Sequence, residues 1–357
     1  MAGGNWECVI EPSGALGRRA AALLDSITSE LLDDVALDAA LFLAQRGEAE
    51  QNPRWMKRAI EHLNTAILSA DALYSTRTFH LFGGLSGLGW AIEHLMRQLN
   101  RLRASKNRQG RATEGLNDDT DTALLLELQR GRWIGSYDLG SGLTGVGTYF
   151  LKRLPAPKAR LGLELVLAHL EAAAPATIFD GKQGVADGLA GVLYLLSEAA
   201  AVKVGSPGTR GLLTACEQAL LEGQERCQQS CFWWDGSLGI AAVRLRSARD
   251  STVDRMLNRC MECVPEGDAS LARGAAGAAH MWGRLYGLSG QREYRAAALR
   301  WWEHAISCAE TTTPAVRAAG VEFLTGPAGL GLALSAALTP VEPEWDAILG
   351  LSTPNAT

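Results

Sequence analysis

The sequence lacks the features that would place it in a membrane, outside the cell or on a nucleic acid. Nowhere do about 18 apolar residues run together, as a membrane span requires, and the N-terminus has no basic segment followed by an apolar core. With 34 Lys and Arg against 39 Asp and Glu, the net charge is −5, and no basic stretch resembles a phosphate-binding patch. We expect a cytoplasmic protein without a membrane span or a nucleic-acid partner.

Cysteines and alternating apolar stretches are also sparse. The chain has seven cysteines, an odd number, and no secretion signal, so free thiols are expected rather than a disulfide framework. No long stretch alternates between apolar and polar residues with a period of two, which argues against a β-sheet. These absences leave a globular chain built from helices.

Helical periodicity is what the sequence does contain. Apolar residues recur at helical spacing in the windows 16–46, 54–73, 161–173, 210–227 and 293–309. The first window reads as two helices or as one broken helix that ends at Gly47. The predicted fold class is therefore all-α.

A polar segment interrupts this pattern at residues 103–122. It carries glycine and mixed charge, and it has no apolar periodicity, so we predict a flexible loop there. The helical pattern continues on both sides of it, which favours an exposed insertion within a single domain over residues 1–357.

Six times a short turn with two glycines three residues apart leads into an apolar helix. Neighbouring turns are separated by 38 residues (Gly239 to Gly277) to 58 residues (Gly87 to Gly145). We number the turns first to sixth by their glycine pairs, Gly84 and Gly87, Gly142 and Gly145, Gly188 and Gly191, Gly236 and Gly239, Gly274 and Gly277, and Gly326 and Gly329.

Each interval has room for an apolar inner helix, a connection and an amphipathic outer helix. Glycines at the start of the inner helices remove Cβ atoms where helix ends crowd, and we expect them to leave amide N–H groups pointing outward. Six such units predict a closed (α/α)6 toroid with its glycine turns at one mouth. An open solenoid is the alternative, but solenoids repeat more evenly and need polar caps.

The flanks of these turns resemble the lanthionine synthetase C-like (LanC-like) family. The matching segments, in order, are "YDLGSGLTGVG", "GVADGLAGV", "WWDGSLGI" and "LARGAAG", and the resemblance covers the chain from about residue 12 to the end. The resemblance implies an α/α toroid that cyclises dehydrated precursor peptides. In the family, a zinc ion held by Cys, Cys and His activates a cysteine thiol for addition to dehydroalanine or dehydrobutyrine.

The resemblance also shows where this chain departs from the family. Trp234, Ala272 and Arg273 occupy the positions of the three zinc ligands, and none of them can bind zinc. Asp187 replaces the histidine of the third turn, Asp235 replaces a tyrosine of the fourth, and the aspartate of the second turn is kept as Asp138. We therefore expect no metal and no other cofactor.

Several functional interpretations of these residues are open. Asp138, Asp187 and Asp235 are candidate acid/base groups, although aspartates near helix starts also act as caps. Arg273 either pairs with Asp187 or Asp235 to hold the mouth together, or stabilises an enolate. The aromatic side chains predicted to bind substrate are those of Tyr137, Trp233 and Trp234, with Trp234 alternatively filling the vacated metal volume.

The leading hypothesis is a zinc-independent LanC-like cyclase that adds a cysteine thiol, or another nucleophile, to a dehydroamino acid in a ribosomally made peptide. Asp187 or Asp138 would be the acid/base group. Its partners would be the dehydrated precursor peptide and, as a candidate, a dehydratase. The alternatives are an inactive LanC-like scaffold that binds the peptide or a partner enzyme, and a carbohydrate-active toroid with an aspartate pair.

Two cysteine pairs are candidates for a replacement metal site. Cys227 with Cys231 and Cys260 with Cys263 have spacings that occur in zinc sites. Both pairs are expected on outer helices away from the glycine turns, which disfavours this interpretation.

Overall fold

The computed structural model describes residues 6–32, 36–104, 115–173, 181–223, 230–247, 250–312 and 322–352. All regular secondary structure in these ranges is helical, which confirms the predicted fold class. None of the helices in these ranges is long and apolar enough to cross a membrane. The chain folds as two compact units, unit 1 (Met1–Ile67, Gln229–Trp233 and Leu257–Pro343) and unit 2 (Leu68–Gln228, Trp234–Met256 and Glu344–Thr357).

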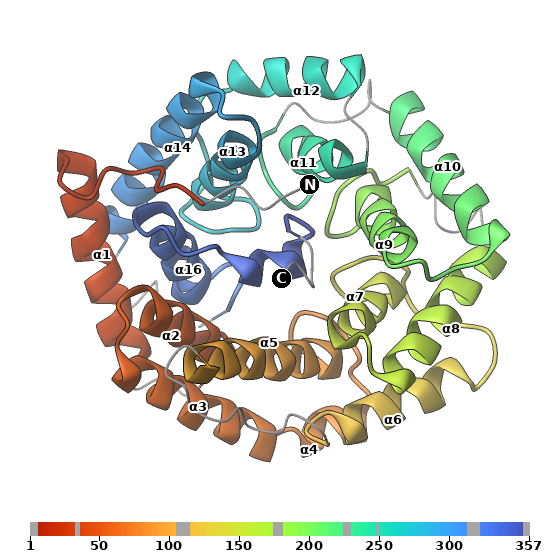
Figure 1. The fold of residues 1–357 in the computed structure, drawn as a ribbon. Helices are drawn as coiled ribbons and strands as arrows, with labels where there is room; N and C mark the ends of the chain where they lie inside the picture. The colour runs from red at the N-terminus through yellow and green to blue at the C-terminus, as the bar shows by residue number, and fades with distance from the viewer. Residues whose placement is uncertain are drawn as a thin grey trace. The chain divides into compact units, whose positions relative to one another are not determined.

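Unit 2 has an inner and an outer layer of helices. The inner layer is α5 (Leu85–Ala104), α7 (Leu143–Arg153), α9 (Leu189–Ala201) and α11 (Ser237–Ser247), each packed against the next. The outer layer is α6 (Asp118–Leu128), α8 (Pro157–Ala173) and α10 (Pro207–Glu222), and α8 and α10 lie outside α7 and α9 (Figure 1). The short α4 (Asp71–Thr76) precedes the first glycine turn.

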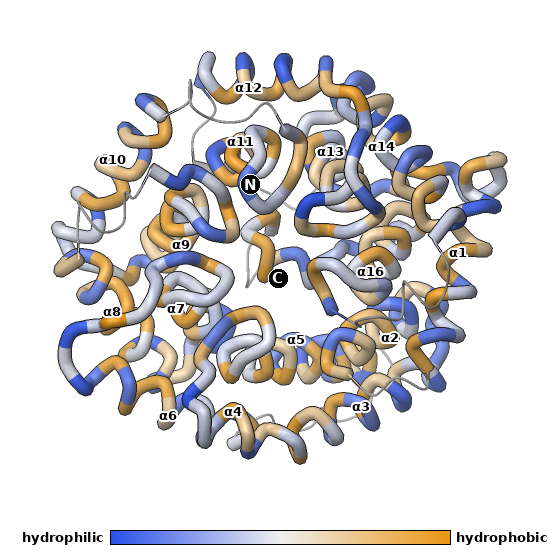
Figure 2. The backbone as a smooth tube through the Cα atoms, turned by 180° about the vertical axis from the view of Figure 1, so that it is seen from behind, coloured by the Kyte–Doolittle hydropathy of each residue, from blue (hydrophilic) through white to orange (hydrophobic). Residues whose placement is uncertain are grey.

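Unit 1 repeats the pairing of inner and outer helices. Its helices are α1 (Ala15–Leu31), α2 (Leu37–Ala49), α3 (Pro53–Leu68), α13 (Ala275–Ser289), α14 (Arg292–Thr311) and α16 (Pro327–Leu338). The apolar α13 packs along α14 and against α16, and α16 packs against α1 and α2. The helix α12 (Ser251–Met261) has hydrophilic residues along one side and hydrophobic residues along the other (Figure 2).

Several predicted boundaries need correction. The window 16–46 is two helices, and the second continues past Gly47 to Ala49. Residues 103–104 belong to α5 and residues 118–122 to α6, so the predicted loop is helical at both ends. Residues 105–114 lie outside the described residues.

A buried ion network joins α5, α6 and α7 in unit 2. The Arg153 guanidinium lies 2.8 Å from Asp121 and 3.0 Å from Glu93, and Arg97 lies 2.8 Å from the other oxygen of Glu93. The Tyr149 hydroxyl donates to Asp121, which is 1% exposed. Burial, together with this carboxylate, raises the pKa of Tyr149. Paired charges of this kind tolerate burial because each countercharge is in place.

The short 3₁₀ helix η2 (Glu344–Leu349) packs on the inner helices of unit 2. The Tyr194 hydroxyl on α9 donates to the carbonyl oxygen of Ala347 at 2.9 Å, and Arg101 at the end of α5 pairs with Glu344 at 2.9 Å. Trp345 and Asp346 are fully buried in this segment. The segment therefore belongs to the core of unit 2.

Steric crowding explains the second glycine of the first, second, third, fifth and sixth turns. In the second turn, a Cβ on Gly145 would lie 2.5 Å from the carbonyl oxygen of Leu139, and the equivalent atoms on Gly87 and Gly277 would lie closer still to Leu81 and Leu271. No side chain fits there, because the helix start passes directly over the turn that precedes it. The repeated glycine is thus a packing requirement of the turn.

Candidate functional site

The first four glycine turns are linked to one another through backbone hydrogen bonds within unit 2. The Leu81 amide donates to the carbonyl of Gly140 at 3.2 Å, the Gly140 amide donates to Ala186 at 2.9 Å, and the Ala186 amide donates to Trp234 at 3.1 Å. We call these four turns the turn cluster. In unit 1, the fifth and sixth turns are linked in the same way, since the amides of Leu271 and Ala272 donate to Leu324 at 3.0 Å.

The amides at the helix starts are used inside each turn. The Leu143 amide donates to Ser136 at 2.9 Å, the Leu189 amide donates to Lys182 at 3.1 Å, and the Ala275 amide donates to Asp268 at 2.7 Å. The expectation that these N–H groups point outward is therefore wrong for these positions. Carbonyl oxygens seven residues upstream satisfy them, so the chemistry available to a ligand must come from side chains.

Asp138 in the second turn forms hydrogen bonds within its own turn. Its carboxylate accepts a hydrogen bond from the Ser141 amide at 2.7 Å, and the hydroxyls of Ser136 and Ser141 donate to it as well. An aspartate that holds an amide and two hydroxyls in this way stabilises the conformation of its own turn. The N-cap of α7 is Gly142 and has no side-chain cap, so these bonds hold the loop before the helix and do not cap the helix itself.

Asp187 in the third turn has a different environment. The Lys182 ammonium lies 3.5 Å from its carboxylate, and the Asp187 side chain remains 29% exposed. A Cβ on Gly184 would lie 3.1 Å from a carboxylate oxygen of Asp187 and 2.8 Å from the Cα of Asp235. The Asp187 carboxylate and the backbone of the half-buried Asp235 therefore both lie beside this glycine, where the third and fourth turns meet.

The fifth turn carries the two remaining positions that the resemblance singled out. Ala272 is buried and its amide holds Leu324, whereas Arg273 is exposed. Arg273 belongs to unit 1 and the three aspartates to unit 2, so its predicted pairing with Asp187 or Asp235 stays a prediction. The residues that the resemblance places at the zinc-ligand positions, Trp234, Ala272 and Arg273, carry an indole, a methyl group and a guanidinium, none of which is a zinc donor.

The aromatic residues predicted to bind substrate differ in accessibility. Trp233 is 1% exposed and belongs to the core of unit 1. Trp234 and Tyr137 are half-buried in unit 2, where the carbonyl of Tyr137 accepts a hydrogen bond from the Thr144 hydroxyl. Trp234 and Tyr137 thus keep part of their surface accessible, and the binding role of all three residues stays a prediction.

The histidines and cysteines add a thiol–imidazole pair that the sequence analysis did not single out. Cys308 Sγ lies 3.4 Å from His304 Nε2 on α14, and His304 Nε2 lies 3.1 Å from the carbonyl of Gly267 before the fifth turn. Burial raises the pKa of Cys308, so the thiol form is favoured. His280, expected in the core, is buried on α13.

The cysteine pairs considered as a metal site are arranged differently from expectation. Cys231 lies outside any helix, in the segment that enters the fourth turn, and Cys227 lies outside the described residues. The Cys231 thiol donates to the carbonyl of Cys260 at 3.3 Å. Among the described side chains, no three His, Cys, Asp or Glu residues are placed to hold a metal ion.

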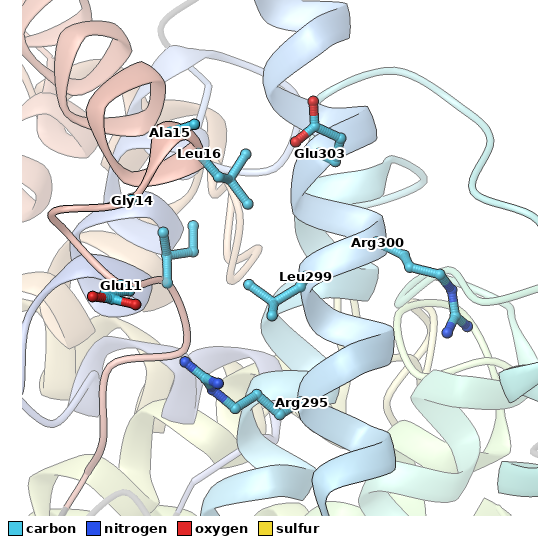
Figure 3. Close-up of a pocket in the computed structure, with 9 residues that line it drawn as sticks. Glu11, Gly14, Ala15, Leu16, Arg295, Leu299, Arg300 and Glu303 are labelled. Carbon is cyan, nitrogen blue, oxygen red and sulfur yellow. The ribbon is translucent and has the colours of Figure 1, made fainter.

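A groove of about 610 Å³ lies elsewhere in unit 1, between the start of α1 and α14. Leu16 and Leu299 face each other across it, and Arg295 extends into it (Figure 3). Its lining residues come from the two helices and the segment before α1, so the groove is separate from the glycine turns.

Lys182, Ser136 and Ser141 are the polar residues of the turn cluster that the sequence analysis missed. Lys182 lies five residues before Asp187 in the same turn, and this proximity was a usable signal for an ion pair. The two serines flank Asp138 at spacings typical of capping motifs. All three decide how much of each carboxylate is available to a ligand.

Comparison with solved structures identifies the fold class. The chain is similar to a structure described as nisin cyclase, with a TM-score of 0.69 and 16% sequence identity over 94% of this chain and 97% of that one. This similarity shows the α/α toroid fold that the glycine turns predicted. No curated protein matches the chain.

The family is shown by a second comparison. The family model described as lanthionine synthetase C-like protein matches residues 38–266, which is more than half of the chain. The chain therefore belongs to the LanC-like family, as its glycine turns and their flanks indicated.

Proposed function

We propose that this chain is a LanC-like peptide cyclase that works without the family's zinc ligands. It adds a cysteine thiol, or another nucleophile, to dehydroalanine or dehydrobutyrine in a dehydrated precursor peptide. In the thiol reaction, sulfur bonds to the β-carbon, the C=C electron pair moves toward the carbonyl as an enolate, and the α-carbon then takes a proton. A dehydratase would supply the dehydroamino acid.

The observation that carries the proposal is the linkage between the third and fourth turns. The bond from the Ala186 amide to Trp234 holds the two turns together, and the very next residues are Asp187 and Asp235. The part-exposed Asp187 carboxylate and the backbone of the part-exposed Asp235 thus lie beside Gly184, on a backbone framework that does not depend on their side chains. Groups held in this way are suited to proton transfer, because positioning is most of what general acid–base catalysis requires.

The roles follow from how each group is engaged. Asp187 is the acid/base group. Its carboxylate forms an ion pair with the exposed Lys182, whereas the Asp138 carboxylate is taken up by hydrogen bonds within its turn. Asp187 accepts the thiol proton and returns a proton to the α-carbon. For the enolate, the sequence offers Arg273 of the fifth turn, and within unit 2 Lys182 is a cation beside Asp187.

Ring closure on the dehydrated precursor tests the proposal. The addition does not change the mass of the peptide, so free thiols are counted by alkylation before mass spectrometry. We expect Asp187→Asn to slow ring formation by about 10²-fold or more, and Arg273→Ala to slow it as well. Glu61→Gln on the exposed face of α3 is the control and keeps the wild-type rate. Equal rates for the protein, both variants and a reaction without protein would overturn the proposal.

A non-catalytic scaffold is the second candidate. It is favoured by the absence of zinc donors at positions 234, 272 and 273 and by the engagement of Asp138 in hydrogen bonds within its own turn. A scaffold would bind the precursor peptide with a measurable dissociation constant while leaving its thiols free. Binding measured together with thiol counting therefore separates the two functions.

A further inference from the structure

Three thiols meet in unit 1, just before the fourth turn. Cys231 belongs to the segment that enters this turn, Cys260 lies in the last turn of α12, and Cys263 follows directly after that helix. The Cys231 thiol donates to the carbonyl of Cys260 at 3.3 Å, and the amide of Cys263 donates to the same carbonyl at 3.2 Å, so Cys231 and Cys263 gather around one oxygen atom. Residues almost thirty positions apart in sequence are thus in direct contact through sulfur.

The three thiols differ in access and in acidity. Cys231 and Cys260 are each 1% exposed, whereas Cys263 is part-exposed at the end of α12. Hydrogen bonding with Cys260 and burial raise the pKa of Cys231. Burial also raises the pKa of Cys263, while a hydrogen bond with Cys231 acts in the opposite direction. Cys263 is therefore the sulfur that a dissolved reagent reaches first, and Cys231 is its buried neighbour.

We propose that Cys263 and Cys231 are a redox modification site, at which a hydroperoxide converts the two thiols into a reversible disulfide. This site is independent of the proposed cyclase activity. It requires an accessible thiol with a second thiol nearby, and redox-sensing cysteines often stand next to such a resolving cysteine.

The chemistry balances in two steps. The sulfur of Cys263 attacks the O–O bond of the hydroperoxide, which gives a sulfenic acid and releases water or an alcohol. The sulfur of Cys231 then attacks the sulfenic sulfur, the S–O bond breaks, and hydroxide leaves with the Cys231 proton as water. The cysteine pair is oxidised by two electrons, and a dithiol reverses the reaction by exchange.

The raised thiol pKa values set the conditions of the reaction. The thiolate is the reactive form, so oxidation is slow at neutral pH and accelerates as the pH rises toward the pKa of Cys263. The disulfide would fasten the segment before Trp234 to the end of α12. The disulfide therefore restrains only the segment that leads into the fourth turn.

Peptide mapping of the intact protein tests the site. The protein is treated with hydrogen peroxide, alkylated, digested without reduction and analysed by mass spectrometry. We expect a linked peptide pair that contains Cys231 and Cys263, lighter than the two free peptides by two hydrogen atoms, which disappears on treatment with a dithiol. Cys263→Ser, a substitution at a part-exposed position, removes the linked pair, and Cys216→Ser on α10 keeps it.

Two results would overturn the proposal. The first is a linkage between Cys231 and Cys260 with Cys263 still alkylated. The second is the accumulation of sulfinic or sulfonic acid on Cys263 with no linked peptide, because this product forms when no resolving thiol reaches the sulfenic acid.

Discussion

The Ala186 amide donates a hydrogen bond across 3.1 Å to the carbonyl oxygen of Trp234, and this single bond ties the third glycine turn to the fourth. Gly140 donates to Ala186 in the same manner, so three turns form a continuous backbone chain in unit 2. Asp187 and Asp235 directly follow Ala186 and Trp234, the two residues that this backbone bond joins. Their chemistry and the stability of the turns can therefore be altered separately.

Asp138→Ala should lower stability without removing the acid/base group. The carboxylate accepts a hydrogen bond from the Ser141 amide at 2.7 Å, and losing such a bond costs about 1 kcal/mol. Urea unfolding measures the change, and Asp187→Ala, which removes an ion pair with an exposed lysine, serves as the comparison and should cost less than Asp138→Ala. The same free energy of unfolding for both variants would contradict the stabilising role of this hydrogen bond.

Gly87→Ala should be strongly destabilising. A Cβ at this position meets the carbonyl oxygen of Leu81, which cannot rotate away, and overpacking of this kind costs about 1–3 kcal/mol or more. Gly211→Ala on α10 is the matched control, because its Cβ meets no atom within 4 Å. We expect this control to stabilise the protein by about 0.5–1 kcal/mol, through better helix propensity. Thermal unfolding compares the two, and a harmless Gly87→Ala would disprove the crowding argument.

Arg153→Met should show the importance of the buried ion network. Its loss leaves Asp121, which is 1% exposed, without a countercharge, and breaking a buried pair costs about 3–5 kcal/mol. Lys57→Met, which breaks an exposed pair with Glu61 on α3, should cost less than about 1 kcal/mol. Chemical unfolding of both variants at pH 7 makes the comparison, and similar small losses would show that the network contributes little.

Lys152→Met should change how stability depends on pH. Burial lowers the pKa of Lys152 to about 8 from the usual 10.5, and the ammonium lies over the Trp90 ring at 5.2 Å. For a lowered pKa, the stabilising contribution is present above pH 10.5 and is lost as the pH falls through 8. The full difference corresponds to about 3 kcal/mol.

The measurement for Lys152 is the free energy of unfolding of the protein and the variant from pH 7 to pH 10. We expect Lys152→Met to be the more stable of the two at pH 7, with the gap narrowing as the pH rises. If the difference in free energy of unfolding between the protein and the variant stays constant from pH 7 to pH 10, Lys152 does not titrate in this pH range.

The glycine pairs made most of the fold predictable. Each pair marks a place where a helix start crosses its own turn, and this requirement is local in sequence, so Gly87 or Gly145 can be recognised without a structure. Helix ends were harder to predict. The helix α2 runs past Gly47, and α6 begins inside a segment that composition alone assigned to a loop, because tertiary packing outweighs intrinsic propensity.

The residues of the candidate site could be predicted from the sequence, but the groups that their side chains contact could not. The turn motifs singled out Asp138 and Asp187, but whether each carboxylate is hydrogen-bonded within its turn or ion-paired depends on the path of the loop around it. The contact of Cys231 with Cys260 is set by tertiary packing across 29 residues, and helical periodicity placed Cys231 on a helix that it does not occupy.

The backbone bonds between the turns bear on how such a site can change over evolutionary time. Because Ala186 and Trp234 are joined through peptide groups, replacing the side chain at position 187, 234 or 235 leaves the joint intact. Substitutions at these positions therefore change the chemistry of the turns while the backbone bonds between them stay in place. Residues of the turns can vary from one relative to another without a change in how the turns are joined.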